Sequence, residues 1–104
     1  MTSNEFVQNL RSGESVFCIR EAGTLVNTLA VYPWHEAYIF HWEEYREEDR
    51  RNRQAYTRNE ITRFEEANDI LAYVESCGYP ASGFAIISGK IDWAKHLLKY
   101  PQKR

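Results

Sequence analysis

The segment from residue 36 to residue 53 constrains the fold more than any other part of this 104-residue chain. It begins as the most aromatic stretch of the sequence and ends as the most charged one. Strand residues point alternately to opposite faces of a sheet. A strand here would place Tyr38, Phe40 and Trp42 on one face and Ile39 on the other. The alternation predicts a strand that is buried at one end and solvent-exposed at the other.

The charged half of this segment, residues 43–53, fits either a helix or a hairpin. Its residues are good helix formers. However, a helix would have no apolar stripe to dock, and like charges such as Glu43 and Glu47 would lie four residues apart and repel. A hairpin that turns at Arg50-Arg51 instead opposes residues whose numbers sum to 101.

Facing pairs in that register are complementary in charge or apolar character, as with Glu43 and Arg58 or Phe40 and Ile61. Registers that sum to 100 or 102 break more of these matches, and a slip of one residue exchanges the two faces of a strand. We therefore expect the hairpin in this register, with the helix as the alternative.

The other elements follow from periodicity and from turn residues. Thr2 and Glu5 form a capping-box pattern, which predicts a helix to about Arg11, and Gly13 is placed to end it. We expect the following elements next: strands over 15–21 and 24–32 joined at Ala22-Gly23, a connection at Pro33-Trp34-His35, a strand over 56–64, a helix from about Glu65 to before Gly78, a short buried strand over 84–88, and a helix over 91–100.

This order, αββββαβα, is that of an α+β domain with a mainly antiparallel sheet of four to five strands and helices packed on one face. The helices should pack on the sheet through two apolar stripes, Ile70/Leu71/Val74 and Ala94/Leu97/Leu98. A chain of this length forms one domain, residues 1–104, with a single core.

Composition narrows the possible functions. The formal net charge is −2, from 13 basic and 15 acidic side chains, so the overall balance draws the chain neither to nucleic acid nor to an anionic membrane. No apolar run is long enough for a membrane span, and the N-terminus lacks a signal-peptide pattern, so we expect a cytoplasmic protein. Cys18 and Cys77 are too few for a disulfide framework or a zinc site and are best interpreted as small hydrophobic residues.

Catalytic motifs are absent from the sequence. The three histidines lack the spacing of a metal site, so neither a metal nor a cofactor is expected. The best acid-base pair is His41 with Glu60 across the predicted hairpin, where a carboxylate could orient an imidazole. This pair lacks a nucleophile, so a small enzyme is the alternative rather than the main hypothesis.

The acidic run offers a binding surface instead. Five of the seven residues from 43 to 49 are carboxylates, and aromatic residues are close in the sequence. Aromatic anchors and opposed charge are typical of protein interfaces. We expect the partner-binding residues to be Trp34, Trp42, Glu43, Glu44, Tyr45, Glu47, Glu48 and Asp49, with Tyr45 as the central anchor. The alternatives are a solvated strand edge and a structural subunit that self-associates through the aromatic strand.

Arginines also interleave with tyrosines between residues 45 and 63, but carboxylates of the same stretch balance them, so direct nucleic-acid binding is not expected. With about 100 residues, one α+β domain, no catalytic motif and the cluster Glu43-Glu44-Tyr45-Arg46-Glu47-Glu48-Asp49, the chain resembles a small bacterial immunity protein. The resemblance implies a non-enzymatic cytoplasmic inhibitor that occludes the basic catalytic domain of a cognate toxin. If the toxin is a nuclease, it implies that the five carboxylates occupy the site meant for phosphate.

Overall fold

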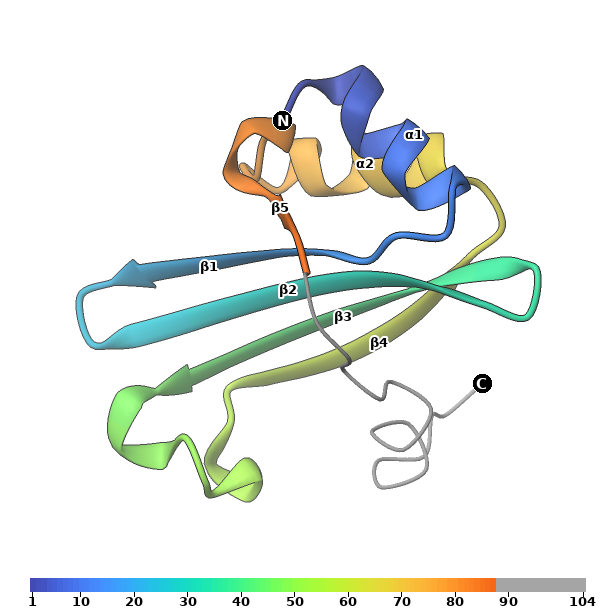
Figure 1. The fold of residues 1–104 in the computed structure, drawn as a ribbon. Helices are drawn as coiled ribbons and strands as arrows, with labels where there is room; N and C mark the ends of the chain where they lie inside the picture. The colour runs from blue at the N-terminus through green and yellow to red at the C-terminus, as the bar shows by residue number, and fades with distance from the viewer. Residues whose placement is uncertain (88–104) are drawn as a thin grey trace.

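The computed structural model describes residues 1–87, which form two helices and a five-stranded sheet. The elements are α1 (Ser3–Arg11), β1 (Val16–Ala22), β2 (Leu25–Trp34), β3 (Ala37–Arg46), the 3₁₀ turns η1 (Glu47–Asp49) and η2 (Arg53–Ala55), β4 (Arg58–Phe64), α2 (Ala67–Ser76), the 3₁₀ turn η3 (Ala81–Gly83) and β5 (Ala85–Ile86). The sheet order is β4-β3-β2-β1-β5, and every neighbouring pair is antiparallel. Both helices lie on one face of the sheet, toward one end (Figure 1). The α+β prediction is confirmed, while the helix expected over 91–100, with its Ala94/Leu97/Leu98 stripe, lies outside the described residues.

The helix signals in the sequence are borne out. The Glu5 backbone N–H donates to Thr2 Oγ1 at 3.1 Å, and the Thr2 backbone N–H donates to Glu5 Oε1 at 2.8 Å, which completes the predicted capping box. The backbone hydrogen bond from Thr2 holds the pKa of the Glu5 carboxyl below its ordinary value. Helix α2 buries its predicted stripe against the sheet, and Gly13 and Gly78 follow the two helices with positive φ.

Strand β3 lies between β2 and β4 and is buried on both faces. Phe40 and Trp42 belong to the main core beneath the helices. Ile39, on the opposite face, packs in a second cluster with Tyr32. The strand becomes more exposed toward Arg46, as the change from aromatic to charged residues predicts.

The hairpin of β3 and β4 is confirmed, but its predicted register is wrong by one residue. Phe40 faces Thr62 and Trp42 faces Glu60, so paired numbers sum to 102. The slip puts Phe64 on the helix-bearing face, where its ring lies 6.4 Å from that of Phe40 and 5.8 Å from that of Tyr73. Burial of this aromatic side chain against α2 outweighs the cross-strand charge matches that favoured the other register. The connection is also longer than a turn at Arg50-Arg51, because η1 and η2 occupy it.

Two further expectations need correction. Strand β2 continues through Pro33 and Trp34, and the chain turns at His35 and Glu36, whose φ values are 47° and 63°. Proline fits there because β1 begins at Val16, opposite Val31, so β2 has no β1 neighbour at Pro33.

Strand β5 was expected to be buried, but Ala85 and Ile86 are exposed at the sheet edge and only the preceding Phe84 is buried.

Substitution of Leu71 by alanine tests the contribution of α2 to the core. Leu71 is buried in the main cluster, so Leu71→Ala should lower the free energy of unfolding by about 2–5 kcal/mol through lost burial and a residual cavity. The exposed neighbour Ala72 provides the control, since Ala72→Ser should change stability by less than about 0.5 kcal/mol. Urea titration measures both variants, and equal stabilities would show that α2 is not part of the core.

The β2–β3 turn predicts a stabilising substitution. A two-residue turn with positive φ at both positions favours Asn-Gly, whereas His35 and Glu36 carry side chains that disfavour this region. The double substitution His35→Asn/Glu36→Gly should raise the free energy of unfolding by about 1 kcal/mol. Gly23 in the β1–β2 turn has a φ of 65° and open space around it, so Gly23→Ala should destabilise by a similar amount. Thermal unfolding of both variants checks the two opposite signs.

Candidate protein-binding site

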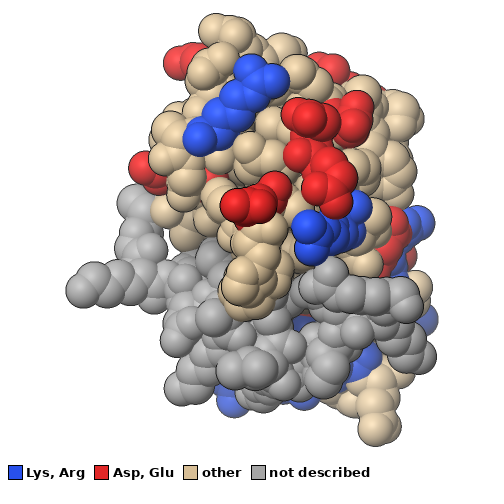
Figure 2. All heavy atoms as spheres, turned by 90° about the vertical axis from the view of Figure 1, so that its right-hand side faces the viewer, with Lys and Arg blue, Asp and Glu red and all other residues tan. Residues whose placement is uncertain are grey.

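The structure separates the residues predicted to form one binding site. Trp34 lies at one end of β3, beside Ala37, and η1 follows Arg46 at the other end. Ten strand residues span about 30 Å, so Trp34 is not part of the acidic cluster. It lines a hollow of about 350 Å³ beside the His35–Glu36 turn, together with Arg11. Figure 2 shows this end of the molecule, where acidic and basic side chains gather on the surface.

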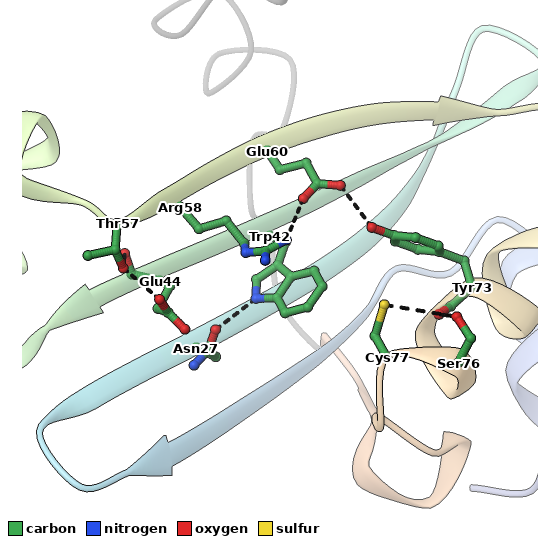
Figure 3. A network of polar contacts seen from close by, with 9 residues as sticks. All are labelled: Asn27, Trp42, Glu44, Thr57, Arg58, Glu60, Tyr73, Ser76 and Cys77. Atoms are coloured by element: carbon green, nitrogen blue, oxygen red, sulfur yellow. Dashed lines mark hydrogen bonds and ion pairs between the residues drawn. The ribbon is translucent and has the colours of Figure 1, made fainter.

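Trp42, one of the predicted binding residues, is buried within the chain. Its side chain is only 7% exposed, and its indole N–H donates to Asn27 Oδ1 at 2.8 Å (Figure 3). The Arg58 guanidinium lies 4.0 Å from the centre of its ring, and Tyr79 packs edge-on at 5.3 Å. One face and the polar edge of this ring are therefore engaged within the chain, and Tyr79 packs against it as well.

The polar network around Trp42 also removes Glu60 from the predicted acid-base pair. Glu60 lies on the helix-bearing face, where it accepts hydrogen bonds from the Tyr73 hydroxyl at 3.0 Å and from Arg58 at 2.7 Å (Figure 3). Burial, together with the Glu60 carboxylate, raises the pKa of Tyr73 to about 12. His41 points to the opposite face, so the His41/Glu60 pair is not formed.

His41 and Glu43 take part in a different arrangement. The ring Nε2 of His41 lies 2.9 Å from Asn59 Oδ1 and 3.6 Å from Glu43 Oε2. Glu43 also forms an ion pair with Arg53 from η2. Glu44, on the other face, accepts a hydrogen bond from the Thr57 hydroxyl at 2.6 Å. The charges of Glu43 and Glu44 thus help to hold the connection between β3 and β4.

Tyr45, predicted to be the central anchor, is only 6% exposed. Its ring stacks on that of Tyr56 at 4.6 Å, and the Tyr56 hydroxyl donates to the Arg50 carbonyl at 2.6 Å. These contacts fix the loop that carries η1. The ring of Tyr45 is therefore engaged within the chain, where it helps to position the acidic loop.

Two of the remaining predicted carboxylates, Glu47 and Glu48, line a hollow at the end of the sheet that we call the hairpin pocket. It has a volume of about 200 Å³ and is lined by Glu21, Gly23, Thr24, Leu25, Val26, Glu47 and Glu48. The β1–β2 hairpin and η1 therefore bring three carboxylates and two aliphatic side chains together. Glu47 makes an ion pair with Arg50 at 2.9 Å, whereas Glu21 and Glu48 make no ion pair in the described part of the chain.

Glu21 was missed in the sequence because it lies 26 positions before Glu47. The strand pairing could have indicated that Glu21 lies near η1. Glu21 pairs with Val26, Val26 pairs with Tyr45, and η1 begins two residues after Tyr45. Asp49, the last residue of η1, is half-buried and does not line the pocket. The pocket thus retains Glu47 and Glu48 from the predicted set and adds Glu21.

Within residues 1–87, no group of three or more histidine, cysteine or acidic side chains is arranged to hold a metal ion. Likewise, neither of the helices described is long and apolar enough to cross a membrane. Comparison of the chain with protein-family models, curated proteins and solved structures found no match. The resemblance to immunity proteins therefore stays a prediction.

Double-mutant cycles can test the observed register in solution. Glu60→Ala combined with Tyr73→Phe should show a coupling energy of about 0.5–1.5 kcal/mol, because the two side chains share a hydrogen bond. Glu60→Ala combined with His41→Ala should show coupling below about 0.3 kcal/mol, since these side chains lie on opposite faces. Chemical denaturation of the single and double variants gives both values, and the reverse ranking would restore the register that sums to 101.

Proposed function

We propose that this protein binds a basic protein partner at the hairpin pocket and acts as a non-enzymatic inhibitor of the immunity type. The observation that carries the proposal is the pocket itself, a hollow of about 200 Å³ that is lined by Glu21, Glu47 and Glu48 together with the aliphatic Leu25 and Val26. The partner we propose is the catalytic domain of a cognate toxin, whose active site would be covered by this end of the sheet.

The pocket suits a lysine or arginine side chain. Such side chains bury an apolar stem while the charged head stays near solvent or a carboxylate. Leu25 and Val26 can pack against the stem, and the carboxylates can accept charge-assisted hydrogen bonds from the head. Glu21 and Glu48 need not break an ion pair to a described residue in order to bind it. A partner with a projecting basic side chain therefore fits this surface in both shape and charge.

The pocket also modifies what the immunity resemblance implies. The resemblance assigns the phosphate-mimicking role to five carboxylates, but Glu43 is paired with Arg53 and Glu44 is bonded to Thr57. We propose that Glu47 and Glu48 take this role together with Glu21. If the toxin is a nuclease, these side chains would meet the basic groups that otherwise hold the phosphate backbone.

Charge reversal tests the proposal. The partner is first identified by co-purification with the tagged full-length chain, with the product of the neighbouring gene as the first candidate. Glu47→Lys/Glu48→Lys should then slow association with the purified partner by about tenfold or more at low salt and flatten its salt dependence. Stopped-flow or surface-binding kinetics at several salt concentrations measure this.

The control places the same charge change at the opposite end of the sheet. Glu14→Lys/Glu36→Lys alters two exposed carboxylates, and each double variant changes the formal net charge from −2 to −2 + 4 = +2. At about 0.15 M salt, association of the control should stay within about twofold of the wild-type rate, because its charges lie much farther from the pocket than the Debye length of about 8 Å and are screened. If both double variants associate at the wild-type rate, the acidic loop only keeps the sheet soluble and the docking proposal fails.

A further inference from the structure

Within residues 1–87, the outer half of β1 is an open strand edge. Strand β5 pairs only with Val16 and Phe17, and one more hydrogen bond joins the Ile87 N–H to the Ser15 carbonyl at 2.9 Å. From Ile19 to Ala22 every residue of β1 is exposed. Figure 1 shows β5 meeting β1 only near the helices, while the rest of β1 extends toward its hairpin.

The backbone groups at this edge are set by the register. Ser15 and Phe17 face β5, and backbone direction alternates along a strand, so Ile19 and Glu21 direct their N–H and C=O groups outward. The side chain of Ile19 is 57% exposed, more than that of any other large hydrophobic residue described. An exposed strand with outward hydrogen-bonding groups and an apolar side chain is a template for another strand.

We propose that an extended segment of the basic partner adds to β1 as an antiparallel strand along Ile19–Ala22. This inference rests on the proposed function and specifies how the partner is held. A residue opposite Glu21 would lie on the same face of the sheet as the hairpin pocket, which Glu21 lines. A basic side chain at that position can enter the pocket while its backbone bonds to β1.

The charges on β1 define the rest of the segment. Arg20 stacks on Tyr79 at 4.1 Å and makes no ion pair with a described residue, so an acidic side chain opposite it would be favourable. An apolar side chain would cover Ile19. Read in its own direction, the added strand therefore has the order basic, acidic, apolar.

A second copy of this chain is a poor occupant of the edge. Antiparallel pairing must join outward-facing residues, and one such register puts the two copies of Arg20 opposite each other. The next places the two copies of Glu21 opposite each other. The register that joins two copies of Ile19 is blocked, because Phe17 already pairs with Ala85. Like charges directly opposed are destabilising, so the sequence disfavours self-association here.

A capped synthetic peptide tests the inference on the full-length chain. Its central residues are arginine, glutamate and valine in that order, so that arginine faces Glu21 and valine faces Ile19. On addition of the peptide, NMR should show slowed hydrogen exchange at the Ile19 and Glu21 amides. Methylation of the peptide's arginine and valine backbone nitrogens should weaken binding about tenfold or more, because these N–H groups face β1. Methylation of the glutamate nitrogen, which faces away, should change binding less than about threefold.

Variants of the protein separate this inference from the proposed function. Ile19→Pro removes an outward N–H at an edge position where proline is tolerated, and should abolish binding, whereas Ile19→Thr should retain it. The methylated peptides give the same information if Ile19→Pro does not fold.

If binding is lost in Glu47→Lys/Glu48→Lys but does not depend on which peptide nitrogen is methylated, strand addition is overturned and the acidic docking site is kept. Binding with protected amides that survives this charge reversal supports strand addition and contradicts the proposed function. Absence of protection at Ile19 and Glu21 at millimolar peptide overturns strand addition.

Discussion

Burial of β3 on both faces is the constraint on which the rest of the structure depends. Phe40 on one face and Ile39 on the other are fully buried, so a slip of the strand would misplace both cores at once. The few buried polar groups reinforce the register. The side chain of Asn27 is 6% exposed, and its Oδ1 accepts a hydrogen bond from the Trp42 indole N–H. Any other register of β2 with β3 would separate these two groups and leave the buried Asn27 oxygen without a donor. Such an unsatisfied group costs about 1–3 kcal/mol.

The sheet also determines where the loop between β3 and β4 is held in place. The loop from β3 to β4 has no buried residues in η1 or η2. It is instead fixed by polar and aromatic contacts to β3, through Arg53 on Glu43 and Tyr56 on Tyr45. These contacts hold Glu47 and Glu48 near the β1–β2 hairpin. Under the proposed function, a preformed acidic surface would lose less conformational entropy on binding than a mobile one, so the buried tyrosine would contribute to recognition without touching the partner.

Local signals in the sequence predicted most of the fold, and non-local packing determined what they missed. The capping box at Thr2 and the apolar stripe of α2 depend on residues three or four positions apart, which the sequence shows directly. The β3–β4 register depends on Phe64 packing against α2, a contact that no cross-strand comparison contains. The His35–Glu36 turn lacks the glycine or asparagine that usually identifies such a turn. The carboxylates of the candidate site were visible as a run, but the sequence could not show which of them the loop contacts would occupy.

Arginine side chains stack on aromatic rings within the described part of the chain. Arg58 covers Trp42, Arg53 lies over Tyr56, and Arg20 covers Tyr79. A guanidinium stacked on a ring leaves that face unable to stack on a base. Since Arg53 and Arg58 also pair with carboxylates, much of the positive charge of this region is used within the chain. The carboxylates of the hairpin pocket lie outside these stacked pairs, and this is the basis for proposing an external basic group as its ligand.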